Sequence, residues 1–252
     1  MKPIALIIAL CALFGATASA QEAHVGPAFM DTFTVVDTVR WRVSDGWSNG
    51  AWTANDWQAR QIRRTASGID ITLQRQSGHE KHFTSGELQS DAGYRYGYYE
   101  VRWQVPRGSG LVSGFFTYTR PGDESTWDEI DIEILGRNTR AVQFTYWRRG
   151  RQHITTVPLA FDAAEGQHVY GFDWQPDYIR WYADGRMIHE ERGQNGPLPQ
   201  ASQRIYLHLW NSEQLTDWLG PIMPWENNWR LSVSCVAQAA SYGGRPLCTG
   251  AR

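Results

Sequence analysis

The segment WDEIDIEILG, residues 127–136, alternates acidic and apolar side chains with a period of two. Side chains on a β-strand point alternately to opposite faces, so this pattern predicts a strand with two different faces. Glu129, Asp131 and Glu133 share one face, and the isoleucines between them face a core. Carboxylates in a row on one face repel each other, so we expect a strand that carries them to use them.

Paired carboxylates are the groups that glycoside hydrolysis requires, one as nucleophile or base and one as general acid. The Cα atoms of Glu129 and Glu133 are about 13 Å apart on a flat strand, whereas retention of configuration needs carboxyl groups about 5–5.5 Å apart. Side chains that lean inward on a concave strand can close this gap. Asp131 adds a charge that helps to keep one glutamate protonated. A calcium site and a solvated acidic edge are the alternatives, although calcium ligands usually come from loops.

Further segments of strand character recur along the chain, with turn residues between them. The predicted strands are residues 69–73, 98–105, 111–119, 142–147, 169–174, 178–183, 204–210 and 230–236. Asp184-Gly185 is the clearest hairpin turn. Long helical periodicity is absent from the sequence, and many strands without helices favour a sandwich or a barrel. In 142–147, alternation puts Gln143, Thr145 and Trp147 on the face of the carboxylates.

The first twenty residues have the pattern of a secretory signal peptide. Lys2 is followed by an apolar run at 4–14, and Ala18-Ser19-Ala20 fits the small-residue cleavage rule. We expect cleavage after Ala20, with residues 1–20 as the signal peptide and 21–252 as a single domain. An N-terminal anchor helix is the alternative, but the apolar run is short for a membrane span.

The mature chain has few signs of partners other than a substrate. The net charge of the full chain is -2 at pH 7, which gives no reason to expect nucleic acid. We expect a secreted or periplasmic monomer that has no membrane attachment after cleavage. Cys235 and Cys248 remain after cleavage, and an even pair in an exported chain predicts a disulfide. Two free thiols are the alternative.

The segment WDEIDIEILG resembles the catalytic signature of glycoside hydrolase family 16, in the form without a bulge residue. Further segments resemble the bacterial licheninases (β-1,3-1,4-glucanases) of that family: SDGWSNG (44–50), YGYYEV (96–101), SGFFTYT (113–119), FDWQP (172–176), WYADG (181–185) and DWLG (217–220). The resemblance covers roughly residues 29–236, in the expected order. It implies an all-β fold, a β-jelly-roll sandwich of two antiparallel sheets with a concave substrate cleft.

The resemblance also implies an activity, that of a retaining endo-β-glucanase acting by double displacement. The family pattern makes Glu129 the nucleophile, Asp131 the assisting residue and Glu133 the acid/base. No cofactor is expected. We also expect no required metal, because the histidines lack metal-ligand spacing and the aspartate of a calcium site is not evident around residues 231–234.

Positions that contact sugar in licheninases can be carried over residue by residue. Those that keep the pattern are Asn49, Glu87, Phe116, Tyr118, Trp127 and Trp210. Those that depart from it are Gln89 in place of Arg, Thr145 in place of Asn, Trp147 in place of Tyr and His208 in place of Asn. Sites that hydrogen-bond particular hydroxyls discriminate strongly. The changes therefore leave two substrate classes open, β-1,3-1,4-glucan and a related bacterial exopolysaccharide.

Three alternatives to this interpretation remain at the level of sequence. A transglycosylase shares the acidic signature and differs only in the acceptor. A non-catalytic carbohydrate-binding jelly roll shares the fold but has no need of the acidic set. Finally, Arg148, Arg149 and Arg151 follow the 142–147 strand, and arginine recognises carboxylates. They raise the hypothesis of an acidic polysaccharide, with a solvated basic turn as the alternative.

Overall fold

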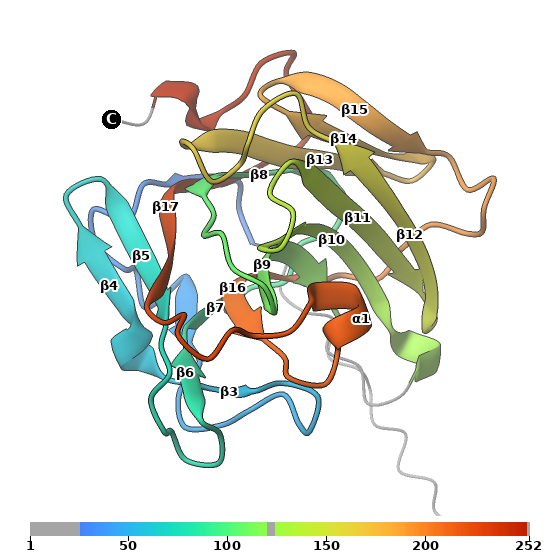
Figure 1. Ribbon diagram of the computed structural model, residues 1–252. Helices are drawn as coiled ribbons and strands as arrows, with labels where there is room; N and C mark the ends of the chain where they lie inside the picture. The colour runs from blue at the N-terminus through green and yellow to red at the C-terminus, as the bar shows by residue number, and fades with distance from the viewer. Residues whose placement is uncertain (1–25, 120–123, 251–252) are drawn as a thin grey trace, which may run out of the picture.

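The computed structural model of the chain describes residues 26–119 and 124–250, and its elements form two facing antiparallel sheets (Figure 1). The expectation of an all-β sandwich is therefore confirmed. The proposed signal peptide, residues 1–20, lies outside the described residues. Within the described ranges, none of the helices is both long enough and apolar enough to cross a membrane.

The sheet that carries the acidic strand, called here the inner sheet, has seven strands in the order β12-β11-β10-β9-β16-β7-β2. Their bounds are β2 Trp41–Val43, β7 Glu87–Ser90, β9 Leu111–Tyr118, β10 Asp128–Leu135, β11 Ala141–Arg148, β12 Arg151–Pro158 and β16 Arg204–Asn211. The acidic segment is thus β10, a central strand held by antiparallel neighbours on both sides.

The outer sheet runs in the order β15-β14-β13-β8-β17-β5-β4, with β1 also paired to β17. Its strands are β1 Phe29–Asp31, β4 Ile62–Thr65, β5 Gly68–Leu73, β8 Gly97–Gln104, β13 His168–Gln175, β14 Tyr178–Ala183, β15 Arg186–Glu191 and β17 Trp229–Ala239. The remaining elements are β3 Asn55–Trp57 and β6 Phe83–Ser85, which pair in parallel, the helix α1 Thr216–Leu219, and the 3-10 turns η1 Ala59–Gln61, η2 Glu124–Thr126 and η3 Cys248–Gly250.

The core lies between the two sheets and fixes the orientation of β10. The three isoleucines of β10 are fully buried, as are Val142, Phe144 and Tyr146 on β11. Across the core, the Phe144 ring stacks on Trp181 of β14, with ring centroids 5.2 Å apart. The Trp181 indole also donates a 3.2 Å hydrogen bond to the backbone oxygen of Asp131. Burial of each of these side chains stabilises the fold by about 1.5–3 kcal/mol. The isoleucine face of β10 is therefore held in the core, and its carboxylate face points to the other side of the sheet.

Each strand predicted from sequence is present, with ends that differ by three residues at most. The sequence pattern did not predict β12, β15 or the strands of three or four residues. Segments that short show no clear periodicity, and β12 and β15 are edge strands whose side chains are mostly exposed or half-buried. A disulfide joins Cys235 in β17 to Cys248 in the C-terminal tail, with Cα atoms 5.8 Å apart, as the cysteine count predicts.

Candidate active site

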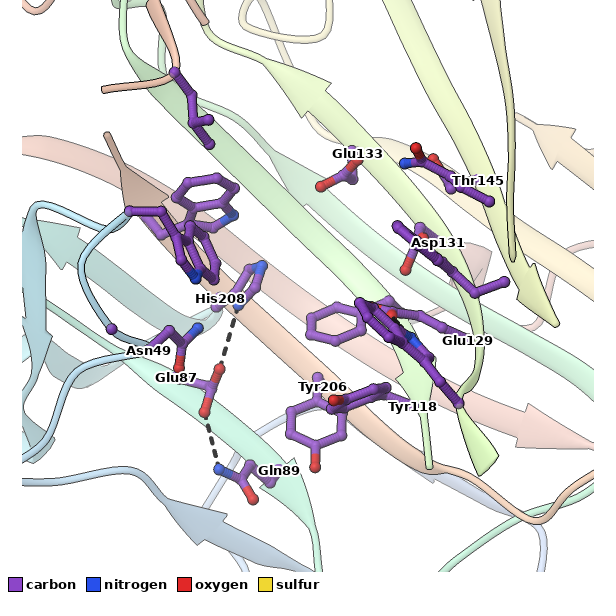
Figure 2. A pocket seen from close by; sticks show the side chains of 18 of the residues that line it. Asn49, Glu87, Gln89, Tyr118, Glu129, Asp131, Glu133, Thr145, Tyr206 and His208 are labelled. Atoms are coloured by element: carbon purple, nitrogen blue, oxygen red, sulfur yellow. Dashed lines mark hydrogen bonds and ion pairs between the residues drawn. The ribbon is translucent and has the colours of Figure 1, made fainter. Parts of the chain in front are cut away.

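One face of the inner sheet borders a cavity of about 760 Å³, within the range usual for ligand sites. The three carboxylates of β10 and all ten side chains expected to contact sugar line it. Figure 2 shows Glu129, Asp131 and Glu133 along one strand, with Asn49 and Glu87 on the other side of the cavity. The structure therefore brings every predicted site residue into one place.

The register of the inner sheet explains why these residues meet. The rows that cross β10 are Tyr118–Glu129–Trp147, Phe116–Asp131–Thr145 and Gly114–Glu133–Gln143. Cross-strand partners lie on the same face of a sheet, so each carboxylate has its row on the cavity side. Aromatic side chains flank Glu129 on both sides, Asp131 lies between an aromatic ring and a threonine, and Glu133 has a glycine on one side and an amide on the other.

Glu129 lies beside two hydrogen-bond donors. The indole Nε1 of Trp127 donates to its Oε2 at 2.6 Å, and Asp131 is hydrogen-bonded to it as well. The Trp127 ring in turn stacks on Trp147, with centroids 4.3 Å apart. Burial raises the pKa of Glu129 to about 7, and the two hydrogen bonds oppose that rise because they favour the ionised carboxylate.

Asp131 is buried between the two glutamates on the same strand. Burial, and then the negative charges of Glu129 and Glu133, raise its pKa well above the usual range. A protonated Asp131 can donate to Glu129, because only a protonated carboxyl has a donor. In its protonated form, Asp131 is a neutral hydrogen-bond donor beside Glu129.

Glu133 receives fewer hydrogen bonds than Glu129 and is affected by the charge of Glu129. Burial and then the charge of Glu129 raise its pKa to about 8, while a 3.2 Å hydrogen bond from Gln143 Nε2 lowers it. The two hydrogen bonds to Glu129 therefore favour its ionised form, and the charge of Glu129 favours a protonated Glu133. One carboxylate can attack while the other gives a proton, which is the division of roles that glycoside hydrolysis needs.

The opposite wall is organised around Glu87, which is only 2 % exposed. Its carboxylate accepts hydrogen bonds from Ser44 Oγ at 2.7 Å and Gln89 Nε2 at 2.9 Å. It also lies 3.3 Å from His208 Nδ1, and Figure 2 shows its contacts with Gln89 and His208. The His208 ring extends over Gly114, where a Cβ atom would lie 2.5 Å from its Nε2. Glycine at 114 is therefore needed to admit the imidazole.

Comparison with known proteins decides the family. The model of "Glycosyl hydrolases family 16" matches residues 49–230. The chain belongs to this family. The resemblance noted in the sequence is thereby confirmed, and the cavity belongs to a family 16 glycoside hydrolase.

Individual relatives of the family 16 chain are similar over most of their length. This chain is 42% identical over 209 residues to the β-glucanase of Bacillus subtilis (strain 168), and the alignment covers 82% of this chain and 84% of the relative. The endo-1,3-1,4-β-glycanase ExoK of Rhizobium meliloti (strain 1021) is 36% identical over 217 residues, with 85% and 79% covered. Among solved structures, a Bacillus licheniformis β-glucanase superposes with a TM-score of 0.79 at 38% identity, covering 85% of this chain and 98% of that chain.

Sequence reasoning missed several side chains that line the cavity of this family 16 domain. They are Trp47, Ser48, Gly50, Trp52, Gln152, Tyr206, Leu215 and Trp218. Alternation along β16 could have revealed Tyr206, because it shares a face with His208 and Trp210. Trp47 and Trp218 lie inside segments that resemble licheninases, but loop positions carry no periodicity from which to infer their direction.

None of Arg148, Arg149 and Arg151 lines the cavity, which contradicts the hypothesis of a basic cluster there. Arg148 Nη1 lies 2.7 and 3.1 Å from the carboxylate oxygens of the buried Asp128. Arg151 is the cross-strand partner of Arg148 and shares its face, opposite to that of Trp147. Within the described ranges, the residues that line the cavity include four carboxylates and neither arginine nor lysine.

Two further observations complete the description of the family 16 site. Thr145 Oγ1 is buried on the cavity wall and has no hydrogen-bond partner within the described part of the chain. Residues 26–119 and 124–250 also contain no group of three His, Cys, Asp or Glu side chains that could hold a metal ion. The expectation that no metal is required stays a prediction.

Proposed function

We propose that this family 16 chain is a retaining endo-β-1,3-1,4-glucanase in which Glu129 is the nucleophile, Asp131 assists and Glu133 is the acid/base. The observation that carries the proposal is the unequal setting of the two glutamates on one strand. Glu129 receives hydrogen bonds from Trp127 and Asp131 that favour its anion, while burial and the charge of Glu129 favour a protonated Glu133. The β-glucanase names of the relatives support the same reaction.

The proposed reaction has two steps. Glu129 attacks the anomeric carbon while Glu133 gives its proton to the leaving glycosidic oxygen, so a glycosyl ester forms at Glu129 and the glycosidic bond breaks. Glu133, now ionised, removes a proton from water, and the resulting hydroxyl displaces Glu129 from the anomeric carbon. Two inversions return the original configuration. Asp131 donates a hydrogen bond to Glu129 in the resting enzyme and so holds it ionised.

The walls of the cavity supply the proposed sugar contacts. Phe116, Tyr118, Trp127, Trp147 and Trp210 offer ring faces or edges to the sugar, and Asn49, Glu87, Gln89, Thr145 and His208 offer hydrogen bonds. The unpartnered Thr145 Oγ1 suits a sugar hydroxyl, since a buried polar atom without a partner is costly. Glu87 is held from three sides, which fixes the direction of its remaining acceptor capacity.

For the substrate, we propose a neutral β-glucan rather than an acidic polymer. The ionised Glu129 of the proposed mechanism would repel uronic, succinyl or pyruvyl groups, and the cavity lining in the described ranges includes neither arginine nor lysine to oppose that repulsion. The alternative substrate is a bacterial exopolysaccharide that is cut within a neutral stretch. Product analysis on lichenan and on acidic exopolysaccharides separates the two classes. It also separates hydrolysis from transglycosylation by showing whether water or sugar is the acceptor.

Two variants test the mechanism. Glu129→Gln should remove essentially all lichenan hydrolysis while keeping the wild-type circular dichroism spectrum, because the amide matches the carboxylate in size. Glu133→Ala should cleave an aryl β-glucoside oligomer with a good leaving group, and added azide should then yield a glycosyl azide of the original configuration. Near wild-type turnover by Glu129→Gln, or an azide product of inverted configuration, would refute the assignment.

We further propose that residues 1–20 are removed on export and that residues 21–252 act as a secreted or periplasmic monomer without membrane attachment. The proposal rests on the n-region, the apolar run and the Ala18-Ser19-Ala20 cleavage pattern. Intact-mass measurement of the exported protein should place its first residue at Gln21, and size-exclusion chromatography should give the mass of one chain. Retention of the apolar segment in a membrane fraction would contradict the proposal.

A further inference from the structure

The segment DWLG, residues 217–220, resembles licheninases but has no role in the reaction described so far. It forms most of α1, from which the Trp218 side chain reaches the cavity. The Trp218 Nε1 donates a 3.0 Å hydrogen bond to Gln143 Oε1, and Gln143 Nε2 donates a 3.2 Å hydrogen bond to Glu133 Oε2. Trp218 therefore connects to the proposed acid/base through a single amide.

We propose that Trp218 and Gln143 are positioning residues for Glu133: the indole fixes the orientation of the amide, and the amide fixes the carboxyl. The proposal deepens the function proposed above, since it rests on Glu133 as the acid/base.

The chemistry of the three groups makes the orientation unambiguous. An indole N–H can only donate, and an amide side chain has one accepting end and one donating end. Because Trp218 occupies the oxygen of Gln143, the NH2 end must face Glu133. Gln143 can therefore donate to Glu133 but cannot accept a hydrogen bond from it. A donor favours the ionised form of a carboxyl, so Gln143 limits how far burial raises the pKa of Glu133.

Both positioning residues are held firmly. Gln143 is 5 % exposed and lies directly opposite Glu133 in the β10–β11 register. Two backbone oxygens of α1 hold it against the residues that flank β9 and β10. That of Leu219 accepts from Gly110 N at 2.7 Å, and that of Asp217 accepts from Arg137 Nη1 at 3.0 Å. The surrounding structure therefore restricts the rotation of the Gln143 amide.

The charged groups around Glu133 set the sign of the effect. Asp131 and Glu129 precede it on β10, and Glu129 raises its pKa by charge repulsion. On the other side, β9 presents only Gly114, beyond which the His208–Glu87 pair lies on β16 and β7. From α1, Asp217 is exposed next to Trp218. Gln143 is the neighbour that lowers the pKa of Glu133 by a direct hydrogen bond.

A direct titration of Glu133 tests the proposal without relying on activity. The full mature protein would be labelled with ¹³C at the glutamate carboxyl, and the Glu133 resonance assigned from its loss in Glu133→Gln. In Gln143→Leu the carboxyl should bind its proton about tenfold more tightly, the change expected from losing a charge-assisted hydrogen bond. In Trp218→Phe the shift should have the same direction, because a freed amide can turn and accept from the protonated carboxyl.

Matched controls are Gln76→Leu and Trp225→Phe, which make the same chemical changes at exposed positions. They should leave the Glu133 titration at its wild-type midpoint. If Gln143→Leu unfolds, Gln143→Met provides a longer apolar side chain with the same loss of hydrogen bonding. An unchanged midpoint in folded Gln143 variants overturns the proposal. So does a shift in Gln143→Leu with none in Trp218→Phe, because Gln143 would then act without its indole partner.

Kinetics provide the second readout. The alkaline limb of kcat/KM on lichenan should move to higher pH in both variants, together with the titration midpoint, which a merely structural defect would not cause. Failure of the wild-type protein to cleave any β-glucan would refute the proposed function. The titration of Glu133 would still test separately whether Trp218 and Gln143 position its carboxyl.

Discussion

At the scale of single residues, the division of roles proposed for Glu129 and Glu133 rests on their hydrogen bonds and mutual charge rather than on burial. Both carboxyls are raised in pKa by burial, and both point into the same cavity. Glu129 receives two hydrogen bonds that favour its anion, and Glu133 receives one together with the repulsion of Glu129. Similar side chains four residues apart therefore hold their protons differently.

This difference predicts a bell-shaped dependence of kcat/KM on pH. Activity should rise as Glu129 ionises with a pKa of about 7 and fall as Glu133 loses its proton with a pKa of about 8. Replacement of Trp127 by Phe removes a donor that favours the Glu129 anion, so the acidic limb should move to higher pH. Initial rates on lichenan from pH 5 to 10 provide the check. A profile flat across that range would contradict the assignment.

The same pKa values predict a cost in stability. The pKa of Glu133 is raised from 4.5 to about 8 in the folded protein, so its contribution to folding is most favourable below pH of about 4.5 and is lost as pH rises through 8. Glu133→Gln should therefore be more stable than the wild type at pH 9 by about 1 kcal/mol or more, a rise in Tm of about 2–4 °C. The difference should shrink at pH 5.

Thermal unfolding at both pH values measures this effect. Glu213→Gln, at an exposed position, is the matched control and should change the Tm little at either pH. A Glu133→Gln variant that is less stable than the wild type at pH 9 would show that the carboxylate stabilises the fold instead.

At the scale of elements, the long strands could be predicted from sequence except for β12 and β15 at the sheet edges, and the short ones could not. A strand of eight residues such as β10 shows several alternations, and its two faces can be assigned from the order of its side chains alone. Strands of three residues, such as β2 and β3, show none. The cavity-facing Trp52 and Trp218 were missed for a related reason, because loops and short helices place side chains by contacts distant in sequence.

Alternation also corrects the prediction about the arginines. Neighbouring residues on a strand point to opposite faces, so Trp147 at the cavity puts Arg148 on the other side of the sheet. There it neutralises Asp128, which also accepts backbone hydrogen bonds from Gln200 at 2.7 Å and Ala201 at 2.9 Å. A residue that lies an odd number of positions from a cleft residue on the same strand points to the opposite face. Closeness in sequence therefore does not place it in the cleft.

The buried Arg148–Asp128 pair predicts a structural phenotype for Arg148→Gln. Removing one partner leaves a buried charge uncompensated, so the free energy of unfolding should fall by about 3–5 kcal/mol. The exposed Arg151, its cross-strand partner, is the control, and Arg151→Gln should change stability by about 0.5 kcal/mol at most. Urea unfolding measures both. A selective loss of activity on acidic polymers, with stability intact, would instead restore the arginines to substrate binding.

At the scale of the whole molecule, the two sheets divide the tasks of catalysis and support. The inner sheet carries the carboxylates and most of the side chains expected to bind sugar, and the outer sheet holds it through the core. The C-terminal tail is fixed to the outer sheet by the disulfide and by Glu100 on β8, which accepts the backbone N–H groups of Leu247 and Cys248. Changes in the tail should therefore affect stability without reaching the reacting groups.

The disulfide tests this separation. Replacing both Cys235 and Cys248 by Ser should lower the free energy of unfolding by about 3 kcal/mol at most, the effect of opening a loop of that size. Glu100 should keep the tail docked, because its hydrogen bonds come from the backbone and survive the substitution. Well below the Tm, kcat/KM and its pH profile should match the wild type, since Cys235 lies on the outer sheet. Two titratable thiols in the unfolded, unreduced wild-type protein would disprove the bridge, and a shifted pH profile in the double variant would show that the sheets are coupled.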